Sequence, residues 1–209
     1  MSRRFTLYLF FVISLCLLRP LAAESKGPYL FLIWNLFLGG LPLFFASFQK
    51  RLRNRPLLGY FNLAAWLVFF PNAPYILTDL VHLNHSQGFD WYDTALIFAA
   101  GVAGLKFTFD SLAMINSELK LKCPSIAQPI WNCAFLALAA YGIYLGRYLR
   151  FNSWDVLHAP EALFKACGSM LLYPHYHLQE WLMVGTYSML LIALQLIWPK
   201  EQQVLEKSI

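Results

Sequence analysis

The stretch FFPNAPYILTDLVHL, residues 69–83, decides the fold, because an apolar segment breaks there at two prolines and restarts with polar side chains. Each proline lacks a backbone N–H and crowds the carbonyl four residues before it. A helix that arrives through Trp66 is therefore predicted to kink or end near Pro71. Asn72 is then expected to be the N-cap of a new helix with Pro74 in its first turn.

The polar residues of this new helix are predicted to share one face. Asn72, Tyr75, Asp79 and His82 follow one another at i, i+3, i+7 and i+10. An α-helix turns by about 100° per residue, so this spacing keeps all four on one side. The other side is apolar, and the break therefore marks a candidate functional site.

The composition excludes a soluble domain, because 59% of the residues are apolar and only 13% are charged. A helix of about 20 apolar residues crosses a bilayer. Six segments qualify: Phe5–Ala23, Tyr29–Phe48, Leu57–Leu83, Trp91–Ile115, Ala127–Phe151 and Leu178–Trp198. The sequence predicts an all-α, polytopic transmembrane helical bundle, with its third span broken at Pro71 and Pro74, as one integral membrane domain over residues 1–209.

The lysines and arginines predict the orientation of this bundle, because cytoplasmic loops retain positive charge. With both termini inside, ten of these residues lie on the inner side and five on the outer side. The densest cluster, residues 50–55, dominates the net charge of +5 and is expected to contact anionic lipid headgroups rather than nucleic acid. We therefore expect a membrane protein whose predicted partner is the lipid bilayer, with both termini in the cytoplasm.

The first segment, residues 1–23, has two interpretations. Arg3 and Arg4, an apolar run and then Leu21-Ala22-Ala23 resemble a secretory signal with a cleavage site. Arg19 directly after the apolar run argues against cleavage. The segment is thus either the first span or a signal sequence, and residue 24 faces outward in both cases.

Polar residues at the outer ends of three spans are predicted to converge. Asp79 and His82 end the third span, Asp93 begins the fourth, and the fifth ends in an unusually polar stretch. That stretch contributes Arg147, Asn152, Asp155 and, beyond them, His158. Such groups are costly to expose to lipid, so we expect them to form one polar pocket in the outer leaflet.

Three further features accompany this pocket. Lys106 and Asp110 lie four residues apart within the fourth span. They are either a structural pair whose charges neutralise each other or part of an ion pathway. Gly104 and Gly142 belong to small-residue patterns that let helix backbones approach closely. Pro160 is placed to open a short interfacial helix before the last span, which is either a lid over the bundle or a packing element.

Several of these blocks resemble an uncharacterised bacterial membrane-protein family, domain of unknown function thirteen-sixty-one. The blocks are residues 66–83, Trp91-Tyr92-Asp93, residues 141–147 and Asn152-Ser153-Trp154-Asp155. The resemblance covers residues 57–198 and implies a polytopic bacterial membrane protein without an assigned activity. Lys106, Asp110 and the first segment lie outside the matching blocks.

Three classes of function fit this sequence. In the enzyme hypothesis, Asp79 and His82 form half of a divalent-metal site that activates water against a lipid-linked or periplasmic substrate, completed by Asp93, Asp155 or His158. The candidate catalytic residues are Asp79, His82, Asp93 and Asp155. The candidate substrate-binding residues are Asn72, Tyr75, Arg147 and Asn152, with Arg147 holding a phosphate or carboxylate.

The second class is a small transporter or channel. In this hypothesis, the half-helix after the break has its positive N-terminal end inside the membrane. Carriers hold an anion or a coupling ion at an interrupted span of this kind. Against it, no inverted repeat is visible in the sequence. The third class is a non-catalytic assembly protein whose polar face binds a partner protein.

Overall fold

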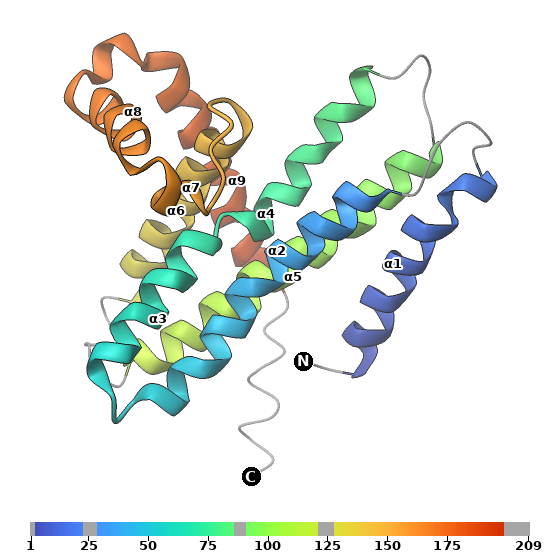
Figure 1. Ribbon diagram of the computed structural model, residues 1–209, viewed down its shortest axis with the longest axis horizontal. Helices are drawn as coiled ribbons and strands as arrows, with labels where there is room; N and C mark the ends of the chain where they lie inside the picture. The colour runs from blue at the N-terminus through green and yellow to red at the C-terminus, as the bar shows by residue number, and fades with distance from the viewer. Residues whose placement is uncertain (1–2, 23–28, 86–90, 121–127, 199–209) are drawn as a thin grey trace.

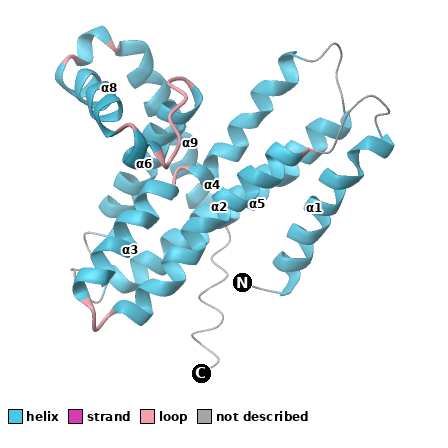
Figure 2. Ribbon diagram, in the orientation of Figure 1, coloured by secondary structure: helices cyan, strands magenta, loops and turns pink. Residues whose placement is uncertain are grey.

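The computed structural model describes residues 3–22, 29–85, 91–120 and 128–198, without the side chains of residues 81–85 and 120. These residues are helical nearly throughout, with short connecting loops (Figures 1 and 2). The helices are α1 Arg3–Ala22, α2 Leu30–Gln49, η1 Lys50–Leu52, α3 Pro56–Phe69, α4 Asn72–Tyr75, η2 Ile76–His85, α5 Trp91–Lys120, α6 Gln128–Arg147, α7 Asp155–His158, α8 Pro160–Leu172, η4 Pro174–Tyr176 and α9 Leu178–Ile197. The described part of the chain contains no strand, which confirms the all-α prediction.

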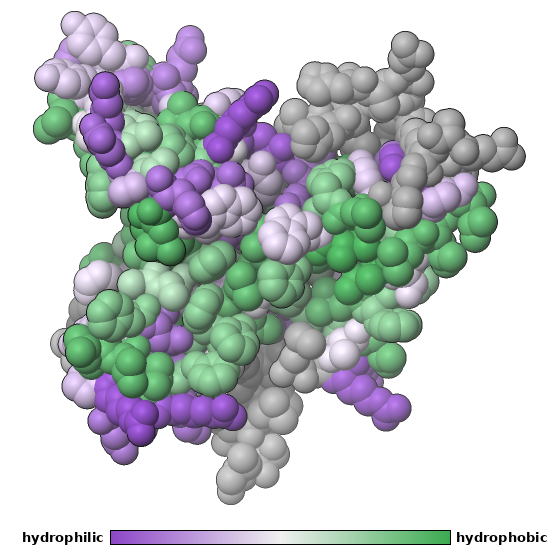
Figure 3. All heavy atoms as spheres, viewed as in Figure 1, coloured by the Kyte–Doolittle hydropathy of each residue, from purple (hydrophilic) through white to green (hydrophobic). Residues whose placement is uncertain are grey.

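Six helical segments are long and apolar enough to cross a bilayer, as the sequence predicted. They are Arg3–Leu21, Leu30–Leu52, Pro56–Leu80, Trp91–Leu119, Gln128–Arg147 and Leu178–Ile197. Large apolar side chains such as Phe10, Phe61 and Met189 are mostly exposed, which a membrane accommodates and water does not. In Figure 3 apolar side chains form a belt between polar groups at the two ends of the bundle.

Helix α5 lies at the centre of the bundle. It packs along α2 and against η2 and α4, while α1 packs on its other side and α9 packs against α6. Trp66 of α3 is completely buried and stacks near Phe70, with ring centroids 4.5 Å apart. This packing fixes the position of the helix break between α2, α5 and α6 (Figure 1).

The third span breaks where the prolines predicted, but it restarts differently. Helix α3 ends at Phe69, α4 has only four residues, and the continuation η2 is a 3₁₀ helix rather than an α-helix. The N-cap position of α4 is occupied by Pro71, so the prediction that Asn72 is the N-cap was wrong. The side chain of Asn72 donates to partners outside its own helix instead.

Glycines on the neighbouring helices allow the broken segment to lie deep in the bundle. A Cβ atom at Gly104 of α5 would overlap the backbone carbonyl oxygen of Ala73. A Cβ atom at Gly142 of α6 would overlap the ring of Pro71. Backbone therefore contacts backbone or proline directly at these positions, as the small-residue patterns predicted.

The short helix before the last span begins at Pro160, as predicted. Its Met170 is buried against α6 and α9, whereas Phe164 and Leu171 are exposed. Helices α7 and α8 lie at the same end of the bundle as the end of α6, at the upper left of Figure 1. They therefore cover the region of the predicted polar site.

Candidate functional site

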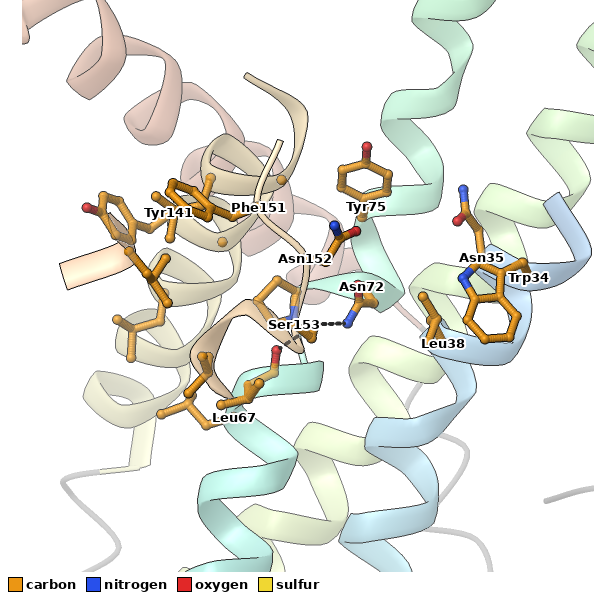
Figure 4. A pocket seen from close by; sticks show the side chains of 18 of the residues that line it. Trp34, Asn35, Leu38, Leu67, Asn72, Tyr75, Tyr141, Phe151, Asn152 and Ser153 are labelled. Atoms are coloured by element: carbon orange, nitrogen blue, oxygen red, sulfur yellow. Dashed lines mark hydrogen bonds between the residues drawn. The ribbon is translucent and has the colours of Figure 1, made fainter. Parts of the chain in front are cut away.

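A cavity of about 400 Å³ lies beside the helix break. Helices α2, α3, α4 and α6 form its walls, and the segment 151–153 with α7 and α8 closes one side. Figure 4 shows Trp34 and Asn35 of α2 on one side, Tyr141 and Phe151 on the other, and Asn72 and Asn152 between them. The cavity thus joins apolar helix walls to polar groups at the break.

Asn72 connects the break to the loop that follows α6. Its Nδ2 donates to the carbonyl oxygen of Phe69 at 3.0 Å and to Ser153 Oγ at 2.7 Å. Ser153 Oγ in turn donates to the carbonyl oxygen of Val68 at 3.2 Å. The last carbonyls of a helix lack intrahelical donors, and here side chains provide them. Both residues line the cavity, so this network shapes one of its surfaces.

Asp79 is the most buried charged group at the site, with 1% of its surface exposed. Its Oδ1 lies 2.5 Å from Arg147 Nη2, and its Oδ2 accepts a hydrogen bond from Asn35 Nδ2 at 2.8 Å. The pair therefore joins η2 to α6 and to α2. This confirms that Asp79 and Arg147 meet, as the convergence of polar helix ends predicted.

Arg147 has further partners that compensate its removal from water. Its Nε and Nη2 donate to Thr78 Oγ1 at 3.1 and 2.7 Å, and its guanidinium carbon lies 4.4 Å from the centre of the Tyr75 ring. A desolvated ion pair needs such additional partners to be stable. Arg147 does not line the cavity, whereas Tyr75 and Asp79 do.

Asp93 is held elsewhere in the bundle. It pairs with Arg19 of α1, whose Nε and Nη2 lie 2.6 and 2.5 Å from its two carboxylate oxygens. The Arg19 guanidinium also lies 4.0 Å from the Tyr29 ring. The predicted common pocket therefore does not include Asp93, because the first turn of α5 faces α1 and Asp93 pairs with Arg19 there.

Asn152 lines the cavity, but Asp155 does not. The Asp155 carboxylate accepts a hydrogen bond from the backbone N–H of Asn152 at 2.6 Å, which fixes the turn before α7. His158 Nδ1 lies 3.1 Å from the carbonyl oxygen of Trp154 at an exposed position. The side chain of His82 lies outside the described residues.

The carboxylate oxygens of Asp79 that the structure describes here already contact other side chains. These side chains are Arg147 and Asn35, so a metal ion bound there would lie beside the Arg147 guanidinium charge. Among the described residues, no three His, Cys, Asp or Glu side chains are grouped closely enough to hold a metal ion. The metal hypothesis for Asp79 and His82 thus remains a prediction from sequence spacing.

Lys106 and Asp110 form the predicted pair on α5, with Lys106 Nζ 3.1 Å from Asp110 Oδ2. Lys106 Nζ also lies 5.3 Å from the centre of the Phe5 ring of α1. Asp110 lines a second cavity of about 780 Å³ between α1, α2 and α5. Of the residues that the structure describes, none lines both cavities, so this pair is separate from the site at the break.

Three polar residues of the site were not predicted from the sequence: Asn35, Thr78 and Ser153. Asn35 is a single amide in an otherwise apolar span, and polar groups within spans carry functional or structural meaning. Its position as an amide within an apolar span could therefore have identified Asn35 from the sequence. Thr78 and Ser153 are small hydroxyl residues whose roles depend on tertiary contacts with Arg147 and Asn72.

Comparison with known proteins supplies the family. Residues 34–194 match the family model described as a protein of unknown function, DUF1361, which extends the resemblance beyond its predicted start at Leu57. No curated protein and no solved structure matches the chain. The matched region contains the helix break, the cavity lining except Phe31, and the Asp79–Arg147 pair, but not α1. The chain belongs to the DUF1361 family of proteins of unknown function.

Proposed function

We propose that this protein binds an amphipathic, lipid-linked molecule whose polar headgroup enters the cavity at the helix break. The main support for this proposal is the composition of the cavity lining, in which apolar walls adjoin a small number of asparagine and serine side chains. Ligand pockets have this composition, because apolar walls provide affinity and a few polar groups fix orientation. A lipid-linked molecule has the same two parts.

The rim of the cavity offers an exit for the lipid chain. Phe31 and Trp34 of α2 line the cavity and are also 40% and 51% exposed on the apolar surface of the bundle. A ligand can therefore enter sideways from the bilayer, with its headgroup against Asn72 and its chain beside α2. This route requires no opening to water.

The distribution of positive charge supports a location at the outer leaflet of a bacterial inner membrane. The end of α6 and the start of α2 lie toward the end of the bundle opposite the basic η1 turn, and the break follows the end of α3 that points away from this turn (Figure 1). Basic loops remain on the cytoplasmic side. The cavity then faces the periplasmic leaflet, and both termini are cytoplasmic.

Binding accounts for the described contacts better than hydrolysis does. Asp79 is neutralised by Arg147, Asp155 fixes a turn outside the cavity, and Asp93 pairs with Arg19. A hydrolase needs a base within hydrogen-bond reach of the attacking water. Each of these carboxylates already has a structural partner, so none of them is presented for that role.

A carrier is the second candidate, favoured by the interrupted third span. Transport requires a route through both halves of the membrane, and the Lys106–Asp110 pair on α5 is the candidate for its second half. Vesicle uptake assays with Lys106→Ala test it. The separate linings of the two cavities favour binding instead.

Site-specific photo-crosslinking in cells tests the binding proposal. A benzophenone amino acid replaces Trp34 in the cavity or, as the control, Trp131, which is 45% exposed on α6 outside the cavity. Position 34 is expected to capture a narrow set of lipid-linked molecules, identified by mass spectrometry, whereas position 131 captures bulk lipid.

A matched pair of asparagines completes this experiment. Asn72→Leu is expected to abolish the selective adducts, because it removes the polar group at the break. Asn62→Leu is the control, since Asn62 lies in the middle of α3, where it donates to Gln49 and to the Phe45 carbonyl and does not line the cavity. Identical adducts at positions 34 and 131 would show that the cavity selects nothing and would refute the proposal.

A further inference from the structure

The charges that line the cavity define a class of headgroup, an inference that rests on the proposed binding function. Among the described residues that line it, Asp79 alone carries a formal charge. That carboxylate is paired with Arg147, which lies behind the cavity wall. A phosphate or carboxylate headgroup would therefore meet a carboxylate and no lining cation, which is unfavourable at low dielectric.

A cationic headgroup is disfavoured for a related reason. Both carboxylate oxygens of Asp79 already accept contacts, from the Arg147 guanidinium and the Asn35 amide. A second cation would have to displace one of these partners or lie beside the guanidinium charge. The lining thus selects against both signs of charge.

The remaining polar groups suit hydroxyl groups. Asn72, Asn152 and Ser153 lie together where α4 meets the loop after α6 (Figure 4). The Asn72 amide donates to Phe69 and Ser153, and the Ser153 hydroxyl donates to Val68, so these two residues offer their oxygen atoms as acceptors. The Asn152 side chain adds a second amide, a group that both donates and accepts. A ring of hydroxyl groups can therefore match this set without carrying charge.

Aromatic side chains flank these polar groups on both sides. Trp34 lies on the α2 side, and Tyr141 and Phe151 lie on the opposite side (Figure 4). The faces of aromatic rings are electron-rich, so they attract the polarised C–H bonds of a sugar ring. The cavity volume of about 400 Å³ falls within the range of small-molecule sites.

We infer that the headgroup bound at the helix break is uncharged and rich in hydroxyl groups, as in a glycosylated or polyol lipid. This assigns Asn72, Asn152 and Ser153 to the headgroup hydroxyls, and the aromatic walls to the ring faces. It also gives Arg147 a positioning role behind Asp79 rather than the anion-binding role that its charge alone suggested.

Native mass spectrometry of the full chain in phosphatidylcholine nanodiscs tests this inference with three probes of matched acyl chains. They are monogalactosyl diacylglycerol, phosphatidylglycerol and diacylglycerol. We expect the galactolipid to be retained about tenfold more than the other two, a ratio that corresponds to about 1.4 kcal/mol. Asn152→Leu and Asn72→Leu are expected to remove the preference, and Asn62→Leu to keep it.

The possible outcomes separate the two proposals. Preferential retention of phosphatidylglycerol, or equal retention of galactolipid and diacylglycerol, overturns the headgroup inference but leaves lipid binding intact if crosslinking at position 34 remains selective. Loss of that selectivity overturns both. If Asn72→Leu does not fold, as judged by gel filtration, Asn152→Leu carries the test, because its side chain lies in the loop after α6.

Discussion

The Asp79 carboxylate lies 2.5 Å from the Arg147 guanidinium, and this contact joins the 3₁₀ continuation of the third span to the end of the fifth. Asn35 adds a link from the second span to the same carboxylate. Three helices that are distant in sequence therefore share one neutral polar cluster beside the break. The interrupted helix depends on this cluster for its position.

Arg147→Met is expected to destabilise the protein strongly, because it leaves the buried Asp79 carboxylate without its cation. Removing one partner of a buried pair costs about 3–5 kcal/mol. The double variant Arg147→Met with Asp79→Asn is expected to recover part of this loss, since no unpaired charge remains. Thermal unfolding in detergent measures both changes.

Arg53→Met is the matched control for that experiment. Arg53 pairs with Glu118 at 3.1 Å, but its side chain is 48% exposed at the basic end of the bundle. An exposed pair contributes about 0–1 kcal/mol. Equal losses for Arg53→Met and Arg147→Met would contradict the special role of the buried pair.

Gly142→Ala and Gly104→Ala are each expected to destabilise the fold, because the added methyl group would overlap Pro71 or the Ala73 carbonyl. Overpacking of this kind costs about 1–3 kcal/mol. Gly168→Ala and Gly185→Ala are the controls, since a Cβ there meets nothing within 4 Å. These controls should be neutral or stabilising, because alanine favours helix. Unchanged stability in Gly142→Ala would contradict the close packing at the break.

The sequence could predict the break and the helices around it, because proline and glycine act locally or through backbone contact. Pro71 ended α3 where expected, and Gly142 allowed the predicted close approach. The 3₁₀ form of η2 was not predictable from the 100° pattern, because Asp79 and His82 are three residues apart and share a face in either helix. Local spacing alone does not distinguish the two.

The site was predictable in part. Charged helix ends on one side of the membrane indicated that Asp79 and Arg147 would meet. Asp93 belongs to the same side, yet it pairs with Arg19, because the packing of α1 against α5 decides which cation it meets. Sequence position gives the depth of a residue in the membrane but not its direction around the bundle.

The Arg19–Asp93 pair predicts that α1 is a packed span. Arg19→Asp is expected to lower the thermal stability, because two carboxylates would then face each other where side-chain exposure is now 12% and 8%. The swap of Arg19→Asp with Asp93→Arg should restore part of the loss. If α1 were cleaved as a signal sequence, Arg19→Asp would have no effect on the mature protein.

Reporter fusions test the proposed orientation, because the location of the binding site depends on it. Fusions after Lys50, Gln87, Leu121, Pro174 and Lys200 are expected to read in, out, in, out and in. Replacing the basic residues 50–55 with glutamine should weaken this preference, since in the proposed orientation positive charge retains the η1 turn on the cytoplasmic side. A cytoplasmic result at Gln87 would place the cavity in the inner leaflet, and its lipid-linked ligand would then have to come from the cytoplasmic side.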